Sequence, residues 1–333
     1  MSSKALKAMK SGRTCSKRKA STFLRLKKSL YRLKQAPANW FETLTSWLKD
    51  INYIQSASDR YDLIVAGKVS AFEDLFKLRF PNSSAHDPDT LLGMELEQHP
   101  GLITLSQPKI IQKGLELLEF AKLKINYRSH MGLLNFLACR KRPDLAPAVS
   151  MLSSFNNNPG IKQWNQVLHC WKYLKGTMDL KVSLRPDSSD FGNKLKYFTD
   201  ATWADDLETR LSRSGSSCFW KSCPILWNSK KQHNIALSST QWIKYLIEEL
   251  WKEKLEPTEF NVENLGLLEK INNFGSNSKT KHLNIKMKLL RDMKNSNQIN
   301  VKLIPAEEMV SDALTKASNA TSLKKLQERA FCQ

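Results

Sequence analysis

The order of strands and helices expected after residue 194 limits the possible folds more strongly than any other feature of the chain. Short runs rich in β-branched and aromatic residues come first, and amphipathic helices and further strands then alternate. We expect strands at 196–199, 216–221, 225–228, 234–238, 259–262 and 299–304. We expect helices at 242–251, 283–294, 310–316 and 322–330. Three or four strands followed by alternating helices and strands predict an α/β fold around one mixed sheet.

The first half of the chain has a different pattern, in which aromatic and aliphatic residues recur at helical spacing. We expect one helix that begins at Pro37 and a second, over 164–174, that ends at Gly176. Shorter elements are expected at 62–67, 71–80 and 91–96, with a turn at Pro100-Gly101. We interpret the aromatic residues of both long helices as core. A cluster of Pro, Asp, Ser and Gly at 186–192 predicts a domain boundary near 183–194.

The charge of the chain favours a nucleic-acid partner. The 52 Lys and Arg residues exceed the 32 Asp and Glu residues, and the net charge is +20. Residues 1–41 contain 12 basic residues and no acid, and we expect residues 1–22 to be a basic, disordered arm. Nucleic-acid phosphates attract such charge whatever the base sequence. A solubilising tail has the same composition, so both interpretations stay open.

Hydropathy and cysteine usage exclude two classes of protein. No apolar run approaches the roughly 18 residues of a membrane span, and the first residues contain no apolar signal core. The six Cys residues are scattered and form no disulfide framework. We therefore expect an intracellular protein, nuclear or cytoplasmic, without a membrane partner. The run Lys17-Arg18-Lys19 fits a nuclear import signal, although an acid-free start also fits a mitochondrial presequence.

Several stretches resemble, in order along the chain, the polyproteins of copia-type LTR retrotransposons. The stretch LKKSLYRLKQAPANWFETL (26–44) is similar to a segment of their reverse transcriptase, and the stretches at 91–111, 127–160 and 171–177 are similar to later segments of the same polyprotein. The C-terminal third resembles their ribonuclease H domain. The matching stretches there are FTDATWADDLETRLSRSG (198–215), WNSKKQHNIALSSTQ (227–241), KTKHLNI (279–285) and VSDALTK (310–316). Order and spacing agree from about residue 24 to residue 330.

The resemblance implies a truncated and degenerate piece of such a polyprotein. Residues 23–183 would be a partial palm and connection remnant of the reverse transcriptase. Residues 194–333 would be a ribonuclease H-like domain, with a mixed five-stranded sheet and flanking helices. The family's polymerase needs several carboxylates to hold two metal ions, and one of them comes from an upstream segment that this chain lacks. Where the family has a Tyr-x-Asp-Asp turn, this chain reads Tyr61-Asp62-Leu63, which leaves one acid. We therefore expect no polymerase activity.

The ribonuclease H domain of the family places four acids at one end of its sheet, where they hold two divalent ions. Asp200 matches the first acid, Asp312 matches the last, and Glu263 stands where the family has aspartate. At the second acidic position this chain has Gln241, and Glu248 lies more than a helical turn further on. The resemblance thus implies that Asp200, Glu263 and Asp312 are the catalytic residues. They would also be the ligands of Mg²⁺ or Mn²⁺, if the site is active.

Basic and aromatic side chains provide a candidate nucleic-acid-binding face. Lys230, Lys231 and Lys281 would contact phosphates, His282 would approach them, and Trp227 would stack on a base. The same pattern also fits a Trp in the core with lysines at its solvent-exposed rim. We keep both interpretations.

The sequence therefore predicts a fragment of a retrotransposon polyprotein that is ancestrally an RNA-directed DNA polymerase and an RNA–DNA hybrid ribonuclease. Its expected partner is nucleic acid, as RNA–DNA hybrid, RNA or DNA, bound without sequence specificity. Two alternatives remain open. The first is a weak Mn²⁺-dependent ribonuclease H that uses the three remaining acids. The second is a non-enzymatic nucleic-acid-binding protein or a non-functional remnant.

Overall fold

The chain divides into two compact units in a computed structural model, Met1–Asp62 and Leu63–Gln333. The structure describes residues 36–53, 69–81, 89–91, 93–120, 126–187, 189–190, 192–202, 212–231, 237–272, 281–316 and 320–332. The expected arm at 1–22 and the expected element at 62–67 lie outside these residues. The domain limits predicted at residues 183 and 194 stay predictions.

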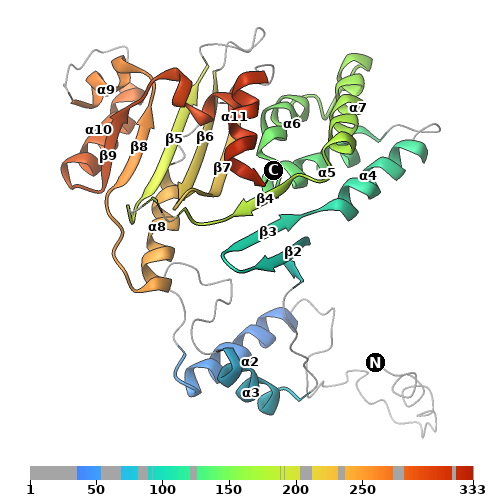
Figure 1. Cartoon of the computed structure of the whole chain (residues 1–333), viewed down its shortest axis with the longest axis vertical. Coiled ribbons are helices and arrows are strands. Elements are labelled where there is room, and N and C mark those ends of the chain that lie inside the picture. Colours follow the sequence, from blue (N-terminus) through green and yellow to red (C-terminus); the bar gives the residue numbers. More distant parts are fainter. Residues whose placement is uncertain are drawn as a thin grey trace, which may run out of the picture. The chain divides into compact units, whose positions relative to one another are not determined.

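The described part of the first unit contains helix α2 (Ala36–Asp50), as its periodicity predicts (Figure 1). Proline suits the first turn of a helix, and Pro37 is the second residue of this one. Leu44, Trp47 and Leu48 form its buried side. The helix ends at Asp50, and Asn52 shortly after it has a φ of +65°, the left-handed conformation that terminates many helices.

An antiparallel sheet, here called the first sheet, lies in the second unit after helix α3 (Val69–Arg79). Its strands are β1 (Thr90–Leu91), β2 (Met94–His99), β3 (Leu102–Ser106), β4 (Lys181–Leu184) and β10 (Phe331–Cys332), in the order β1-β2-β3-β4-β10. The strand expected at 91–96 is interrupted because the chain turns at Gly93, whose φ is +79°. The predicted turn at Pro100-Gly101 is confirmed, and it joins β2 to β3.

A group of helices packs around one buried core beside the first sheet (Figure 1). These helices are α4 (Pro108–Phe120), α5 (Tyr127–Arg140), η1 (Pro143–Leu145), α6 (Ala146–Ser153) and α7 (Ile161–Gly176). The predicted end of α7 at Gly176 is confirmed. Trp171 of α7 is fully buried and belongs to this core with Leu134 and Leu137 of α5. The interpretation of the aromatic residues as core is therefore correct for Trp171 of α7 and Trp47 of α2, but it is wrong for Trp40 and Phe41 of α2, which are exposed.

Gly114 allows α4 to approach α7 closely. A Cβ atom added to Gly114 would lie 2.0 Å from Cη2 of Trp171, an impossible separation. The indole of Trp171 is enclosed on all sides, so it has little room to move away.

We predict that Gly114→Ala lowers the free energy of unfolding by about 1 to 3 kcal/mol, because the added methyl group overpacks the core. Chemical denaturation of the full chain measures this value. Gly132→Ala is the matched control, since Gly132 also lies in a helix but has no atom within 4 Å of its added Cβ. The control should be neutral or slightly stabilising, because Ala favours helix more than Gly does. Equal effects of the two substitutions would contradict the packing argument.

A mixed sheet of five strands, here called the second sheet, follows β4 in the chain. Its strands are β5 (Leu195–Ala201), β6 (Arg213–Trp220), β7 (Cys223–Lys231), β8 (Thr258–Val262) and β9 (Ile299–Leu303), in the order β7-β6-β5-β8-β9. The pairs β5–β6 and β6–β7 are antiparallel, and the pairs β5–β8 and β8–β9 are parallel. The expected five-stranded mixed sheet is thus present in the described residues.

Helices cover both faces of the second sheet. Helices α8 (Leu237–Trp251), α9 (Leu265–Asn272) and α10 (Lys281–Asn295) supply Ile247, Ile271 and Leu290 to the core on one face. The opposite core contains Phe198 and Phe219, which pack against the C-terminal segments. These segments are η3 (Ala306–Glu308), η4 (Val310–Leu314) and α11 (Ala320–Ala330). Because side chains alternate along a strand, Tyr197 faces one core and Phe198 faces the other.

Two predicted elements differ from the structure. The strand expected at 234–238 is wrong for its last two residues, which begin α8, and residues 232–236 lie outside the described part. The segment expected to be helical at 310–316 is a 3₁₀-helix over Val310–Leu314. Its bonds run from residue i+3 to residue i, as from the Thr315 N–H to the Asp312 carbonyl at 3.1 Å. Such tight helices are normally short.

The C-terminal end of the chain returns to the first sheet. Helix α11 contacts η4 and β7 of the second sheet and also η1 beside the first sheet (Figure 1). The next residues form β10, in which Phe331 pairs with Val182 of β4. The two sheets are therefore connected by the chain near residue 190 and again through α11.

A buried ion pair lies where α11 meets the helices of the first sheet. The side chains of Arg142 and Asp144 are fully buried and are 2.7 Å apart. The Tyr173 hydroxyl donates to Asp144 at 2.5 Å, and Gln327 of α11 donates to the Tyr173 hydroxyl at 2.6 Å. The Arg142 guanidinium also donates to the side chain and carbonyl of Thr177. Each charged group of the pair is thus compensated.

Lys141, next to this pair, is buried without such compensation. Its ammonium nitrogen is enclosed and has no hydrogen-bond partner among the described residues. Burial, together with the charge of Arg142, lowers the pKa of Lys141 from 10.5 to about 8. Below pH 8 the folded protein therefore contains a buried charge that costs roughly 3 kcal/mol, at 1.36 kcal/mol for each pKa unit.

We predict that Lys141→Met stabilises the protein at pH 7 and that this advantage shrinks by roughly 2 kcal/mol as the pH rises to 10. Between pH 8 and 10.5 the unfolded lysine binds a proton that the folded lysine has lost, so the stability of the wild type rises with pH in this window. Denaturation of both proteins across this range measures the difference. Arg142→Met is the contrasting variant, which should cost about 3 to 5 kcal/mol because it leaves Asp144 buried and unpaired. A constant difference between Lys141→Met and wild type across this pH range would rule out the predicted titration.

Candidate functional site

Two predicted acids lie together at the carboxyl ends of neighbouring parallel strands. Asp200 is the last but one residue of β5, and Glu263 directly follows β8. Thr199 of β5 pairs with Val262 of β8, so Asp200 and Glu263 are the next positions of the two strands. Parallel strands end at the same edge of a sheet, and ligand sites of open α/β sheets commonly lie there. We call this place, together with Asp312 of η4, the acidic edge.

Asp312 reaches the acidic edge because η4 lies directly on β6. Gly215 of β6 leaves room for it, since an added Cβ would lie 2.7 Å from Cβ of Leu314 and 2.8 Å from the Ser311 carbonyl oxygen. The buried Ser311 hydroxyl donates to the Phe198 carbonyl at 2.9 Å. Ser311 and Ser217 also form a hydrogen bond at 3.0 Å. The small residues of β6 therefore position the segment that carries Asp312.

A hydroxyl group links two of the three acids. The side chain of Thr315 donates to Oδ2 of Asp200 at 2.5 Å and contacts the Asp312 carbonyl oxygen at 3.0 Å. Thr315 is completely buried, so this link is held rigidly. Asp200, at the end of a strand, is thereby joined to the segment after η4.

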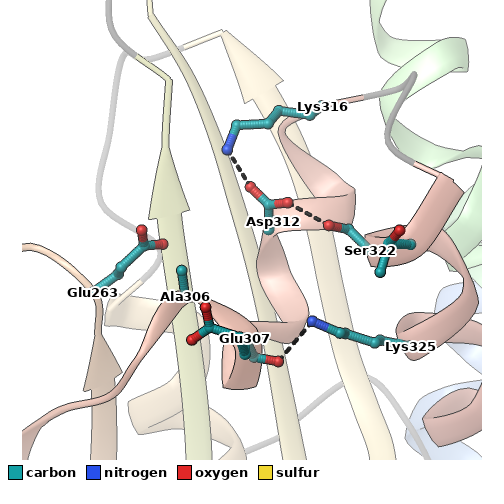
Figure 2. Close-up of a pocket in the computed structure, with 8 residues that line it drawn as sticks. Glu263, Ala306, Glu307, Asp312, Lys316, Ser322 and Lys325 are labelled. Atoms are coloured by element: carbon teal, nitrogen blue, oxygen red, sulfur yellow. Dashed lines mark hydrogen bonds and ion pairs between the residues drawn. The ribbon is translucent and has the colours of Figure 1, made fainter.

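The carboxylate of Asp312 has partners on both of its oxygens. Lys316 forms an ion pair with Oδ1, and the Ser322 hydroxyl donates to Oδ2 (Figure 2). The side chain of Asp312 is 11% exposed, whereas that of Lys316 is 52% exposed. Lys316 therefore extends from the solvent side toward a carboxylate that is nearly enclosed.

Two adjoining cavities open at the acidic edge. One, of about 250 Å³, is lined by Glu263, Glu307, Asp312, Lys316, Ser322 and Lys325, among others (Figure 2). The other, of about 620 Å³, is lined by Asp200, Glu263, Asn264 and Lys316, among others. Glu263 and Lys316 border both cavities. Lys325 donates to the Glu307 carbonyl oxygen at 2.8 Å and not to a carboxylate (Figure 2).

The electrostatics of the edge reflect this grouping. Burial and the charges of Asp200 and Asp312 raise the pKa of Glu263, and Lys316 partly opposes them. The hydrogen bond to Asp312 and the charges of the three acids raise the pKa of Lys316. The acids therefore raise the pKa of Lys316, and Lys316 in turn lowers the pKa of Glu263 against the effect of the other acids.

A divalent ion does not fit this arrangement. Within the described residues, no three His, Cys, Asp or Glu side chains converge closely enough to hold a metal ion. Both oxygens of Asp312 are used, one by the ammonium of Lys316. The Mg²⁺ or Mn²⁺ expected on Asp200, Glu263 and Asp312 would have to displace that ammonium.

The residue at the expected second acidic position lies toward the other end of the sheet. The Gln241 amide donates to the side chain of Gln298 at 3.4 Å. The Gln298 carbonyl oxygen accepts from the N–H of Thr258, the first residue of β8, whereas Glu263 follows the last residue. Glu248 accepts from the Leu255 N–H at 2.9 Å, just before β8. The expectation that Glu248 cannot join the acids agrees with this position.

The predicted nucleic-acid-binding residues have different locations. Ser214 pairs with both Ala201 of β5 and Lys230 of β7, so Lys230 lies at the same end of the sheet as Asp200. Lys230 is exposed, and Lys231 is the last residue of β7. Lys281 and His282 begin α10, but their side chains lie outside the described residues, so their roles stay predictions.

Trp227 serves the core, as one of the two interpretations proposes. Its indole N–H donates to the Ala138 carbonyl oxygen at 2.7 Å, and its ring packs against the core that contains Phe198. These contacts join β7 to α5.

Sequence reasoning missed the roles of Thr315, Lys316 and Ser322. A signal for one of them existed, since Lys316 follows Asp312 by four residues in a segment predicted to be helical. Residues four apart on a helix face each other, and opposite charges at this spacing pair. Ser322 is ten residues from Asp312, and no local spacing indicates its contact.

We predict that Gly215→Ala lowers the free energy of unfolding by about 1 to 3 kcal/mol, because the methyl group pushes η4 away from β6. Denaturation of the full chain measures this loss. Ser214→Ala, at the neighbouring position of the same strand, should have little effect, since it removes atoms and adds none. If Gly215→Ala is tolerated as well as Ser214→Ala, the close approach of η4 does not position Asp312.

The fold and the site together define an α/β protein whose mixed sheet ends in a group of acids. No protein-family model matches the chain. Among curated proteins, it is 27% identical to the retrovirus-related Pol polyprotein from transposon RE2 of Arabidopsis thaliana, over 88% of this chain and 24% of that protein. It is 28% identical to the corresponding polyprotein from transposon TNT 1-94 of Nicotiana tabacum, over 88% of this chain and 27% of that protein.

The chain is a homologue of the retrovirus-related Pol polyproteins of copia-type transposons, as its motifs predict. It spans about a quarter of the length of these relatives. A solved structure of a foamy viral protease-reverse transcriptase in complex with dsDNA is similar at 14% identity and a TM-score of 0.46. That match covers 83% of this chain and 60% of that one, and it is too distant to carry a conclusion. Among the described helices, none has the length and hydropathy to cross a membrane.

Proposed function

We propose that residues 194–333 are a ribonuclease H-like domain of a retrotransposon polyprotein, which binds nucleic acid and does not cleave it. The observation that carries this proposal is the acidic edge, where Asp200 and Glu263 end two neighbouring parallel strands and Lys316 forms an ion pair with Asp312 beside them. In this proposal residues 23–183 are the reverse transcriptase-like remnant and residues 1–22 are a basic arm.

Charge and position support binding at this edge. The chain carries a net charge of +20, which attracts phosphates at long range. Lys230 is exposed at the same end of the second sheet as Asp200, within the width of two neighbouring strands. Phosphate contacts of this kind give affinity without sequence specificity. The proposed ligand is accordingly nucleic acid, as RNA–DNA hybrid, RNA or DNA, bound without sequence specificity.

The absence of cleavage is expected from the requirements of two-metal hydrolysis. Two divalent ions must be held at fixed positions against the attacking and leaving oxygens. Here Asp312 is paired with a lysine, and the fourth position is Gln241, directed toward the other end of β8. We also propose that polymerase activity is lost. Only the sequence supports this part, because Tyr61 and Asp62 lie outside the described residues.

We predict that the full chain binds a fluorescent RNA–DNA hybrid but cleaves it no faster than Asp200→Asn does, in Mg²⁺ or in Mn²⁺. Lys230→Gln should weaken hybrid binding roughly 3- to 10-fold at low salt and reduce the salt slope by about 1, because one phosphate contact is lost. Fluorescence anisotropy over a range of salt concentrations measures both values.

Lys254→Gln is the matched control for binding. Lys254 is equally exposed but lies just before β8, at the other end of the strand from Glu263. Equal losses for Lys254→Gln and Lys230→Gln would show that general charge, and not this edge, binds the hybrid. Cleavage that disappears in Asp200→Asn would instead establish an active ribonuclease H and overturn the proposal.

A further inference from the structure

Lys316 occupies a special position among the basic residues of the acidic edge. It borders both cavities, and its ammonium is paired with Asp312, whose second oxygen is held by Ser322. Lys325 also borders the smaller cavity, but it contacts a carbonyl oxygen and not a carboxylate. Figure 2 shows this difference in direction.

We propose that Lys316 is a built-in counter-ion of the acidic edge, which takes the place of a divalent cation and makes the domain independent of metal. This inference rests on the proposed function, which takes the acidic edge as the site of a ribonuclease H-like domain. It goes further by naming the group that replaces the metal.

Like charges explain why the edge needs a cation. Glu263 lines one cavity with Asp312 and the other with Asp200, and the charges of both act on it. Their repulsion would oppose folding if no positive charge stood beside them. Lys316 is only four residues from Asp312, so the effective concentration of its ammonium at the Asp312 carboxylate is always high. An ion from solution has no such advantage.

The partners of Asp312 add a second obstacle to a metal ion. To bind Asp312, the ion must separate an ion pair and a hydrogen bond on a carboxylate that is 11% exposed. Thr315 likewise holds Asp200 through an oxygen that a metal would need. Lys316 thus pairs with one of the three acids and lies within electrostatic range of the other two.

The test compares the thermal unfolding of the full chain in EDTA and in millimolar Mn²⁺. The melting temperature of the wild type should be the same in both solutions. Lys316→Gln should melt lower in EDTA. Mn²⁺ should raise its melting temperature by about 2 to 4 °C, because the carboxylate of Asp312, no longer held by an ion pair, can then move toward an ion that it shares with Glu263, and this ion binds the folded state. Lys316→Arg keeps the charge and should respond to Mn²⁺ as little as the wild type does.

Two control variants separate this effect from general loss of charge. Lys325→Gln removes a lysine from the same cavity and should gain no response to Mn²⁺. Asp312→Asn combined with Lys316→Gln should lose the response that Lys316→Gln gains. If Lys316→Gln does not fold, an electron paramagnetic resonance titration of the wild type with Mn²⁺ still tests the proposal, because no binding is expected at millimolar concentration.

Stabilisation of the wild type by Mn²⁺, or a folded Lys316→Gln without any response, would overturn the inference. Neither result changes whether Lys230 contributes to hybrid binding. Loss of hybrid binding in the wild type would overturn the proposed function and leave the role of Lys316 standing. The two proposals therefore fail separately.

Discussion

The buried ion pair of Arg142 and Asp144 is the interaction on which the arrangement of the second unit depends. A guanidinium and a carboxylate can be removed from water only when their charges and hydrogen bonds are compensated. Here the compensating groups come from two parts of the chain: Thr177 and Tyr173 at the end of α7, and Gln327 on α11. The guanidinium also lies 5.1 Å from the ring centre of Tyr173 and 5.8 Å from that of Phe331 in β10. One polar cluster thereby ties the helices of the first sheet to the C-terminal end of the chain.

This polar cluster also determines where the acidic edge can form. Helix α11 begins close to η4, and Ser322 in its first turn holds Asp312. The end of the same helix is fixed by Gln327, by β10 and by the ion pair. The segment that carries Asp312 is thus fastened on one side to β6, through Gly215 and Ser311, and on the other side to α11. The position of one carboxylate depends on contacts more than 100 residues away in sequence, such as that between Ser311 and the Phe198 carbonyl oxygen.

Much of the fold could be predicted because it follows from local pattern. The helical spacing of Trp164 and Trp171 indicates α7, and Gly176 marks its end. The short run of apolar and aromatic residues within 216–221 indicates β6. The candidate site was predictable to the extent that Asp200 and Glu263 end adjacent parallel strands. The strand expected at 234–238 failed where Leu237 begins α8, because a short apolar run fits a strand and a helix equally well.

The sequence by itself determined the succession of strands and helices and their relation to copia-type Pol polyproteins, because both depend on the order of residue types along the chain. Only the tertiary structure decided what the acids contact. Lys316 and Ser322 share one carboxylate, Gln241 turns toward the other end of β8, and Trp227 bonds to α5. These contacts arise from the packing of distant segments, and the charge of a carboxylate in a sequence does not tell whether a metal ion, a lysine or water will neutralise it.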